Sequence, residues 1–152
     1  MTAPDATGTT RTVTGRCACG AVGLRITGPL RPVIACHCDS CRRQSGHIVA
    51  ATAALRDDIE IEGAENLNWW RATPDAQRGF CRTCGSLMLW QRDGSEAISI
   101  MAGCLDAPTG LNIQAHIFAA EAGDYYVPGH DTAAVYPGHE RSVEEGIPKR
   151  MG

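Results

Sequence analysis

The chain has 152 residues, of which 43% are hydrophobic and 20% charged, a composition typical of one soluble globular domain. Its 14 basic and 17 acidic residues give a formal charge of −3, which offers no basic footprint for nucleic acid or an anionic membrane. No apolar run approaches the ~20 residues that cross a bilayer, and the N-terminus lacks a secretory pattern, so we expect a cytoplasmic protein.

Short apolar runs separated by turn residues dominate the chain and predict a mainly β fold. We expect a flexible arm over residues 1–10, a zinc-binding domain over 11–140 and a C-terminal tail over 141–152. The expected strands cover residues 12–16, 21–27, 32–36, 48–54, 59–62, 67–72, 77–81, 86–91, 97–101 and 114–119.

Two local signals refine this pattern. Asp93-Gly94 lies between two apolar runs, which predicts a hairpin. The only segment with helical character covers residues 39–45, with Asp39 or Ser40 as its N-cap and Gly46 as its end.

The eight cysteines are the strongest chemical signal in the sequence. In a reducing compartment they are expected to be thiols or metal ligands rather than a disulfide framework. Cys-x-Cys and Cys-x-x-Cys spacings bring sulfurs from one turn close enough to share a tetrahedral ion. Seven of the eight fall into such clusters: Cys17 and Cys19; Cys36, Cys38 and Cys41; Cys81 and Cys84.

The seven clustered thiolates divide most naturally into four and three, which predicts two zinc ions per chain. The pairs Cys17/Cys19 and Cys81/Cys84 would make a closed, structural four-sulfur site. The remaining three, Cys36, Cys38 and Cys41, would hold a second zinc with one position open, as in catalytic zinc sites.

Several alternatives remain open at the level of sequence. The second group could recruit Cys104 or a histidine and be structural, although Cys104 is most simply a small buried side chain. Thiolate sites also suit iron, and Cys81 to Cys84 could be a redox pair, but it leads into a strand rather than a helix. The two Pro-Gly-His turns, at His130 and His139, could form a third metal site or be ordinary turns.

The sequence resembles the glutathione-dependent formaldehyde-activating enzyme family, or S-(hydroxymethyl)glutathione synthase-like proteins. The resemblance covers residues 13–126 and rests on four motifs. These are Gly15-Arg-Cys-Ala-Cys-Gly-Ala-Val22, Cys36-His-Cys-Asp-Ser-Cys-Arg-Arg-Gln-Ser-Gly46, Arg78-Gly-Phe-Cys-Arg-Thr-Cys-Gly-Ser86, and His116-Ile-Phe118 followed by Gly123-Asp-Tyr-Tyr126.

That resemblance implies a β-tent of several small antiparallel sheets joined by a structural four-cysteine zinc site, with a second zinc on three thiolates. It implies a carbon–sulfur lyase in which the second zinc, on Cys36, Cys38 and Cys41, holds the thiol of glutathione or a similar partner for addition to formaldehyde or a related small carbonyl. The alternative is a zinc-stabilised binding module without enzyme activity.

Other polar residues near these motifs have two interpretations. Arg42 and Arg43 could pair with the carboxylates of an anionic peptide or remain solvated on the helix surface. His37 and His47 could shuttle protons or be exposed or packed residues. His116, on an apolar strand, is better explained as a satisfied core histidine than as a substrate contact.

Overall fold

The computed structural model describes residues 11–139, which form a mainly β fold with one α-helix. The predicted arm over 1–10 and tail over 141–152 lie outside the described residues. The elements are β1 (Thr12–Arg16), β2 (Gly23–Thr27), β3 (Val33–Cys36), α1 (Asp39–Ser45), β4 (Val49–Leu55), η1 (Arg56–Asp58), β5 (Ile59–Glu62), η2 (Ala64–Asn66), β6 (Leu67–Thr73), β7 (Ala76–Cys81), β8 (Leu87–Arg92), β9 (Ala97–Met101), η3 (Ala102–Cys104), β10 (Ile113–Ile117), η4 (Ala119–Glu121) and β11 (Ala134–Val135).

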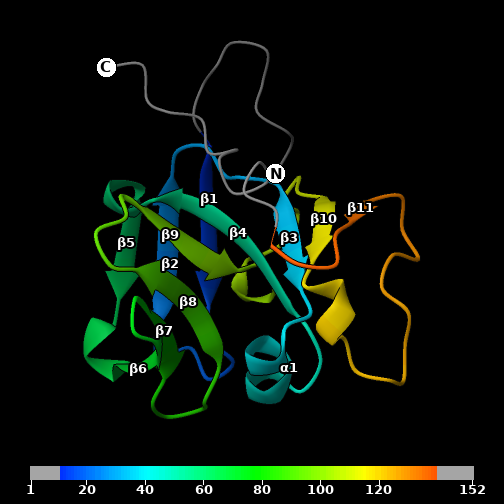
Figure 1. Ribbon diagram of the computed structural model, residues 1–152. Coiled ribbons are helices and arrows are strands. Elements are labelled where there is room, and N and C mark those ends of the chain that lie inside the picture. The colour runs from blue at the N-terminus through cyan, green and yellow to red at the C-terminus, as the bar shows by residue number, and fades with distance from the viewer. Residues whose placement is uncertain (1–10, 140–152) are drawn as a thin grey trace.

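The strands form two sheets (Figure 1). A three-stranded antiparallel sheet has the order β1-β2-β5, and an eight-stranded sheet has the order β11-β10-β3-β4-β9-β8-β7-β6. Antiparallel pairing, as expected, holds for most neighbours, but β10 runs parallel to β3 and to β11. Parallel neighbours need a long connection, and about 75 residues of chain separate β3 from β10.

The main core contains buried side chains from both sheets. Val13, Leu24 and Ile26 of the small sheet belong to the same buried cluster as Met88 and Ile100 of the large sheet. The strands β1 and β2 each alternate buried and less buried residues, as expected for strands with one face toward the core. Burying each large aliphatic side chain contributes about 1.5–3 kcal/mol, so this cluster fixes how the two sheets meet.

Most predicted elements are confirmed, including the hairpin at Asp93-Gly94, which joins the antiparallel strands β8 and β9. The helix spans Asp39–Ser45 and ends at Gly46, whose φ of 88° is in the left-handed region. Its N-cap is Cys38 rather than Asp39 or Ser40, because the Cys38 sulfur accepts a hydrogen bond from the Cys41 amide.

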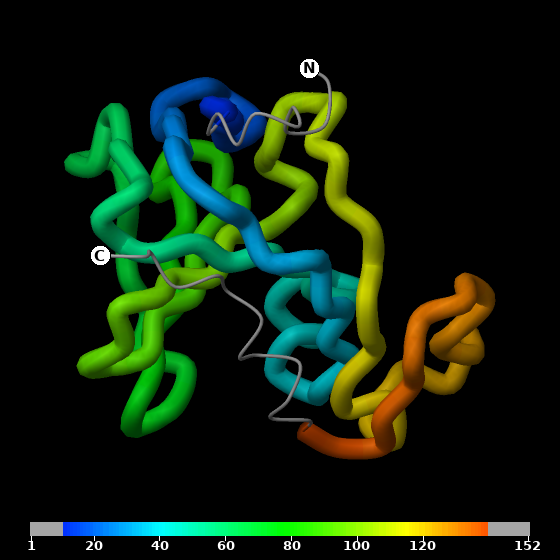
Figure 2. The backbone as a smooth tube through the Cα atoms, turned by 90° about the horizontal axis from the view of Figure 1, so that it is seen from above, coloured from blue at the N-terminus to red at the C-terminus, as the bar shows by residue number. Residues whose placement is uncertain are grey.

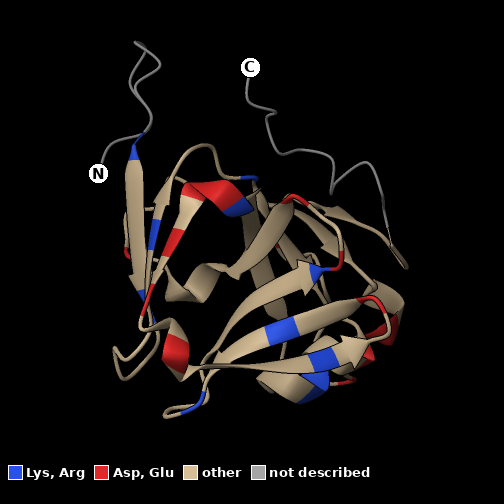
Figure 3. Cartoon of the chain, turned by 90° about the vertical axis from the view of Figure 1, so that its left-hand side faces the viewer, with Lys and Arg blue, Asp and Glu red and all other residues tan. Residues whose placement is uncertain are grey.

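The charged side chains of residues 11–139 are dispersed over the surface that Figure 3 shows. On the face shown in Figure 3, acidic and basic residues are interspersed over the strands and turns rather than gathered in a field of one sign. No helix among residues 11–139 has the length and apolar character needed to cross a membrane.

Helix α1 lies close to the start of β4 and below the lower ends of β3 and β10 in the ribbon view (Figure 1). The last described segment, drawn in orange, runs along the outer side of β10 (Figure 2). Cys36 is the last residue of β3, and Ile117, its partner in the parallel pair, is the last residue of β10. One end of this sheet therefore brings β3, α1 and the segment after β10 together.

Candidate metal centres and their surroundings

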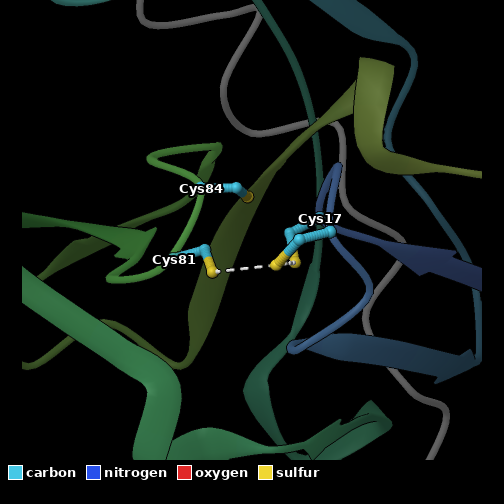
Figure 4. Close-up of side chains that lie close together, drawn as sticks. Cys17, Cys81 and Cys84 are labelled. Atoms are coloured by element: carbon cyan, nitrogen blue, oxygen red, sulfur yellow. Dashed lines mark hydrogen bonds between the residues drawn. The ribbon is translucent and has the colours of Figure 1, made fainter.

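The first cysteine group brings together four sulfur atoms, from Cys17, Cys19, Cys81 and Cys84, that all lie within 4.8 Å of one another. The sulfurs of Cys17 and Cys19 are 3.6 Å apart, and those of Cys19 and Cys81 are 3.8 Å apart. A zinc ion with Zn–S bonds of about 2.3 Å has tetrahedral edges of about 3.8 Å, so these separations fit a four-thiolate zinc. Figure 4 shows Cys81 and Cys84 projecting from one turn toward Cys17 on the opposite side.

Backbone geometry explains why each pair forms a tight turn. Gly20 and Gly85, which directly follow Cys19 and Cys84, have φ values of 81° and 79°, a conformation that glycine adopts without steric cost. Backbone amides donate to the sulfurs within the same turns, from Val22 to Cys17 over 3.3 Å and from Thr83 to Cys81 over 3.4 Å. Such donors favour the thiolate form that a metal requires.

Two of these thiols are also easier to ionise than an ordinary cysteine. Hydrogen bonds from the Ser86 hydroxyl and amide lower the pKa of Cys84 to about 5. Burial opposes ionisation of Cys17, but the Val22 amide and the neighbouring thiols lower its pKa overall. The pKa of Cys19 is raised to about 11, so a metal is indicated by the four sulfur donors and their spacing, which suit a thiophilic ion such as zinc.

The position of this group links the two sheets. Cys17 directly follows β1 of the small sheet, whereas Cys81 is the last residue of β7 in the large sheet. A hydrogen bond of 3.0 Å from the Ala18 amide to the Ser86 hydroxyl joins the same two turns. The four cysteines could therefore hold one ion at the junction of the sheets, as the sequence predicted.

The second group contains three sulfurs, from Cys36, Cys38 and Cys41, that also lie within 4.8 Å of one another. Cys36 ends β3, Cys38 caps α1, and Cys41 lies in the first turn of that helix, so the strand-to-helix junction assembles the group. The thiols of Cys36 and Cys41 are the largest causes that lower the pKa of Cys38, followed by the Cys41 amide and the Arg78 charge.

Arg78 of β7 contacts this group, and it was not among the site residues predicted from the sequence. Its guanidinium is buried, and Nη2 donates to Cys41 Sγ over 3.4 Å while Nη1 donates to the Gln44 side chain over 2.8 Å. A buried cation is costly unless an anion or acceptors surround it. Arg78 therefore fits a group that carries negative charge on sulfur.

Cys104 does not join the second group. Its thiol donates to the Leu87 carbonyl over 3.5 Å, and burial is the main cause that raises its pKa to about 11. Within residues 11–139, the groups of three or more candidate ligands comprise only the two cysteine sets, so His130 and His139 form no third metal site there. The alternative in which Cys104 is the fourth ligand of the second cysteine group is not supported.

The histidines near the second group are hydrogen-bonded rather than free. His37 and His116 are buried, and His37 Nε2 lies 2.9 Å from His116 Nδ1. Tyr126 contacts the other nitrogen of His37, and the Asp131 carboxylate contacts His116 Nε2 at 3.0 Å. His116 is thus a satisfied buried histidine, as expected, and Asp131 is a partner that sequence spacing could not identify.

The remaining predicted polar residues lie on the surface of this region. Arg42 and Arg43 both pair with Asp39 on the exposed side of α1, at 2.8 and 2.9 Å. His47 Nδ1 lies 3.0 Å from the hydroxyl of Tyr125. The two arginines are thus already paired with a carboxylate of their own helix.

A shallow cavity of about 450 Å³ adjoins α1 and is lined by Asp39, Ser40, Arg43, Gln44 and Trp70. Trp70 is 49% exposed, and Trp69, its neighbour on β6, is 40% exposed, so neither is a core residue. Trp70 is a wall of this cavity, whereas the Trp69 ring packs over Gly79.

Comparison with known proteins assigns the chain to a family. The sequence model for the family described as glutathione-dependent formaldehyde-activating enzyme matches residues 12–121, which include both cysteine groups. No curated protein matches the chain. A solved structure from Rhodobacter sphaeroides, described only as a protein of that organism, is 31% identical with a TM-score of 0.53, and the match covers 62% of this chain and 88% of that one. Because the family match spans most of the described fold, the chain belongs to the glutathione-dependent formaldehyde-activating enzyme family.

Proposed function

We propose that the protein is a zinc-dependent carbon–sulfur lyase that joins a small thiol, such as glutathione, to formaldehyde or a related small carbonyl. The observation that carries this proposal is the difference between the two cysteine groups. The first has four sulfurs, whereas the second has three and no fourth candidate ligand among residues 11–139. Three protein ligands leave one coordination position for a substrate.

Cys36, Cys38 and Cys41 would hold the second zinc, and Cys17, Cys19, Cys81 and Cys84 the structural one. A bound zinc supplies the chemistry of holding a thiol as its thiolate at neutral pH. In the reaction, a C–S bond forms, the carbonyl π bond breaks, and the proton that leaves sulfur ends on oxygen. The product is a hemithioacetal, and the reverse reaction cleaves the same C–S bond.

The chain's own residues support this use of the site. Arg78 offsets negative charge at Cys41, which limits the accumulation of charge when a fourth sulfur arrives. Val49 and Met101 form a buried apolar cluster with Cys41, which keeps one side of the group away from water. The cavity lined by Ser40, Gln44 and Trp70 adjoins α1, the helix that carries Cys41, and we assign the body of a peptide thiol to it.

The test has a binding arm and a rate arm, both with protein loaded with two equivalents of zinc. Calorimetry should show heat when glutathione is added, and no comparable heat with S-methylglutathione, which lacks the thiol. The rate of hemithioacetal formation should exceed the uncatalysed rate, because this addition also proceeds without a catalyst.

Cys38→Ser should lose both the glutathione heat and the rate gain, whereas Cys104→Ser, outside both groups, should keep them. Retention of one zinc per wild-type chain with no glutathione heat would instead support a zinc-stabilised binding module. Visible absorption bands in the purified protein would indicate iron rather than zinc.

A further inference from the structure

Arg78 lies in a row of three side chains that crosses the large sheet. In the antiparallel register, Arg78 on β7 is opposite Trp70 on β6 and Trp90 on β8. Directly opposed residues of neighbouring strands project from the same face of a sheet. Trp70 lines the cavity beside α1, whereas Trp90 packs against the buried cluster that contains Cys41. Arg78 therefore lies between the cavity and the second cysteine group.

The Arg78 guanidinium connects these two regions through hydrogen bonds. Nη2 donates to Cys41 Sγ over 3.4 Å. Nη1 donates to the side-chain oxygen of Gln44 over 2.8 Å and to the Ser40 carbonyl over 3.5 Å. Ser40 and Gln44 both line the cavity. One side chain thus contacts a sulfur of the second group and, through its other terminal nitrogen, two residues of the cavity wall.

The contact with Arg78 fixes the orientation of the Gln44 amide. A guanidinium has only donors, so the carboxamide must turn its oxygen toward Arg78. Its NH₂ group, which has two donors, then points away from the cation. Among residues 11–139, no acceptor takes a hydrogen bond from Gln44 Nε2. The cavity wall therefore contains an oriented donor group whose partner the described chain does not supply.

The charges of the cavity wall favour an anion. Asp39 and Arg43 both line the cavity, and one oxygen of the Asp39 carboxylate pairs with both Arg42 and Arg43. One carboxylate cannot neutralise two guanidinium groups, so this part of α1 carries surplus positive charge. An ionised acceptor also makes a stronger hydrogen bond with an amide donor than a neutral acceptor does. A carboxylate is thus the acceptor that matches both the Gln44 donors and the surplus charge.

We infer, on the basis of the proposed function, that Gln44 selects the thiol substrate by donating a hydrogen bond to a carboxylate in the body of that molecule. Arg78 is the positioning residue, because it holds the Gln44 oxygen and leaves the NH₂ group for the ligand. The substrate class is a thiol that carries a carboxylate, which includes peptide thiols such as glutathione. A thiol without this group leaves the Gln44 donors unpaired when it fills the cavity, which lowers its affinity.

The test compares glutathione with its diethyl ester, in which both carboxylates are esterified and the thiol is unchanged. Dissociation constants are measured by calorimetry with protein loaded with two equivalents of zinc. A hydrogen bond to a charged group typically changes affinity by about 10- to 100-fold. Wild-type protein should therefore bind glutathione at least about tenfold more tightly than the ester. Equal affinities would overturn the inference.

Gln44→Glu separates the two roles of this side chain. Glutamate keeps an oxygen for Arg78, so the metal content should stay at that of wild type, but it has no NH₂ donor. The preference for glutathione over the ester should fall to less than about threefold. Gln44→Met should also lose the preference, and because it adds no charge, this loss separates the missing donor from repulsion. A preference that persists in either folded variant would show that Gln44 does not select the thiol.

Gln77→Glu is the matched control for the added charge. Gln77 precedes Arg78 on β7, and successive residues of a strand point to opposite faces of the sheet. This variant should keep the wild-type preference for glutathione. The same loss of preference in Gln77→Glu and Gln44→Glu would assign the selection to overall charge and contradict the role of Gln44.

Arg78→Lys tests the positioning residue. Lysine keeps the positive charge but lacks the planar fork that contacts Cys41 and Gln44 at once. The ratio of the two dissociation constants should fall toward one. A weaker metal site alone would affect both thiols equally and leave this ratio unchanged, so an unchanged ratio would exclude Arg78 as the positioning residue.

Failure of this inference differs from failure of the proposed function. If both thiols give heat with wild-type protein and bind equally well, the site binds thiols without selecting a carboxylate, and the proposed function stands. If neither thiol gives heat with the zinc-loaded protein, both proposals are overturned. A direct readout is the ¹⁵N NMR signal of the Gln44 side-chain amide, identified by its absence in Gln44→Glu. Glutathione should shift this signal, and a signal that stays in place on saturation would contradict the contact.

Discussion

Arg78 donates a hydrogen bond from Nη2 to the sulfur of Cys41 over 3.4 Å, and Arg78 is only 6% exposed. The cation lies on β7 of the large sheet, whereas the sulfur lies on α1. The second cysteine group thus has a buried cationic partner on β7 of the large sheet.

Replacement of Arg78 by Met should weaken metal binding at the second group while the first group keeps its ion. Partners that hydrogen-bond to metal ligands typically change metal affinity by about 10- to 100-fold, and we expect a loss on that scale. Competition with a zinc-binding dye measures the two affinities separately. Arg71→Met is the control, because Arg71 is an exposed residue that pairs with Asp93. Equal loss at both groups would mean that Arg78 supports the fold rather than the second site.

The two cysteine groups should differ in what their removal does. Cys84→Ser opens the four-sulfur group between the sheets and should unfold the domain, since structural zinc binding is coupled to folding. Cys38→Ser should remain folded and contain about one ion fewer than wild type. Circular dichroism with metal analysis checks both outcomes. If Cys38→Ser unfolds as Cys84→Ser does, the second group is a structural site.

Removal of the metal should destabilise the whole domain, because the first cysteine group links the two sheets. The buried core contains small side chains such as Ala54 as well as large ones, and the junction of the sheets depends on four sulfurs from two turns. A chelator should therefore lower the thermal unfolding temperature strongly, and added zinc should restore it. An unchanged melting temperature after complete metal removal would contradict a structural role for the first group.

Gly63 should be intolerant of substitution because it packs tightly against the turn that follows Cys17 and Cys19. Its φ is +69°, and a Cβ atom there would lie 2.0 Å from the Ala21 carbonyl oxygen. Gly63→Ala should lower the free energy of unfolding by about 1–3 kcal/mol, measured by chemical denaturation of the metal-loaded protein. Gly103→Ala is the control, since a Cβ atom there has no neighbour within 4 Å. Equal stability of the two variants would show that the Ala21 turn moves freely.

Trp70 should contribute to the affinity for a peptide thiol but not for a small one. Trp70→Ala removes a wall of the cavity beside α1, and loss of one aromatic contact is worth about 0.5–1.5 kcal/mol. We expect KM for glutathione to rise by up to about tenfold, with little change for 2-mercaptoethanol. Trp69→Ala is the matched control, because Trp69 packs over Gly79 instead of lining the cavity. A parallel rise for both thiols would place the peptide body elsewhere.

Local patterns in the sequence were sufficient for much of the fold. Apolar runs bounded by Gly, Pro and Asp located ten of the strands, and Gly46 located the end of the helix, because turn geometry and capping depend on neighbouring residues. The pair β10–β11 has only two residues on β11, Ala134 and Val135, too few for a periodic signal. The parallel pairing of β10 with β3 also could not be read locally, since it joins segments far apart in the chain.

The candidate site likewise has features that local sequence predicts and features that depend on distant parts of the chain. Cysteine spacing identified both sulfur groups, since ligands from one turn must be close in sequence. Arg78 and Asp131 were missed because their partners, Cys41 and His116, come from other elements. The N-cap at Cys38 was missed because sulfur is not among the usual capping groups, although here it accepts from the Cys41 amide.

The open position at the second cysteine group is tested most directly by cobalt(II) substitution followed by absorption spectroscopy. Wild-type protein should bind two cobalt ions per chain, and glutathione should increase the sulfur-to-cobalt charge-transfer absorption as a fourth thiolate joins Cys36, Cys38 and Cys41. Cys38→Ser should lack this increase, and S-methylglutathione should not produce it. A spectrum that does not change when glutathione is added to the fully loaded protein would contradict the proposed role of the second group.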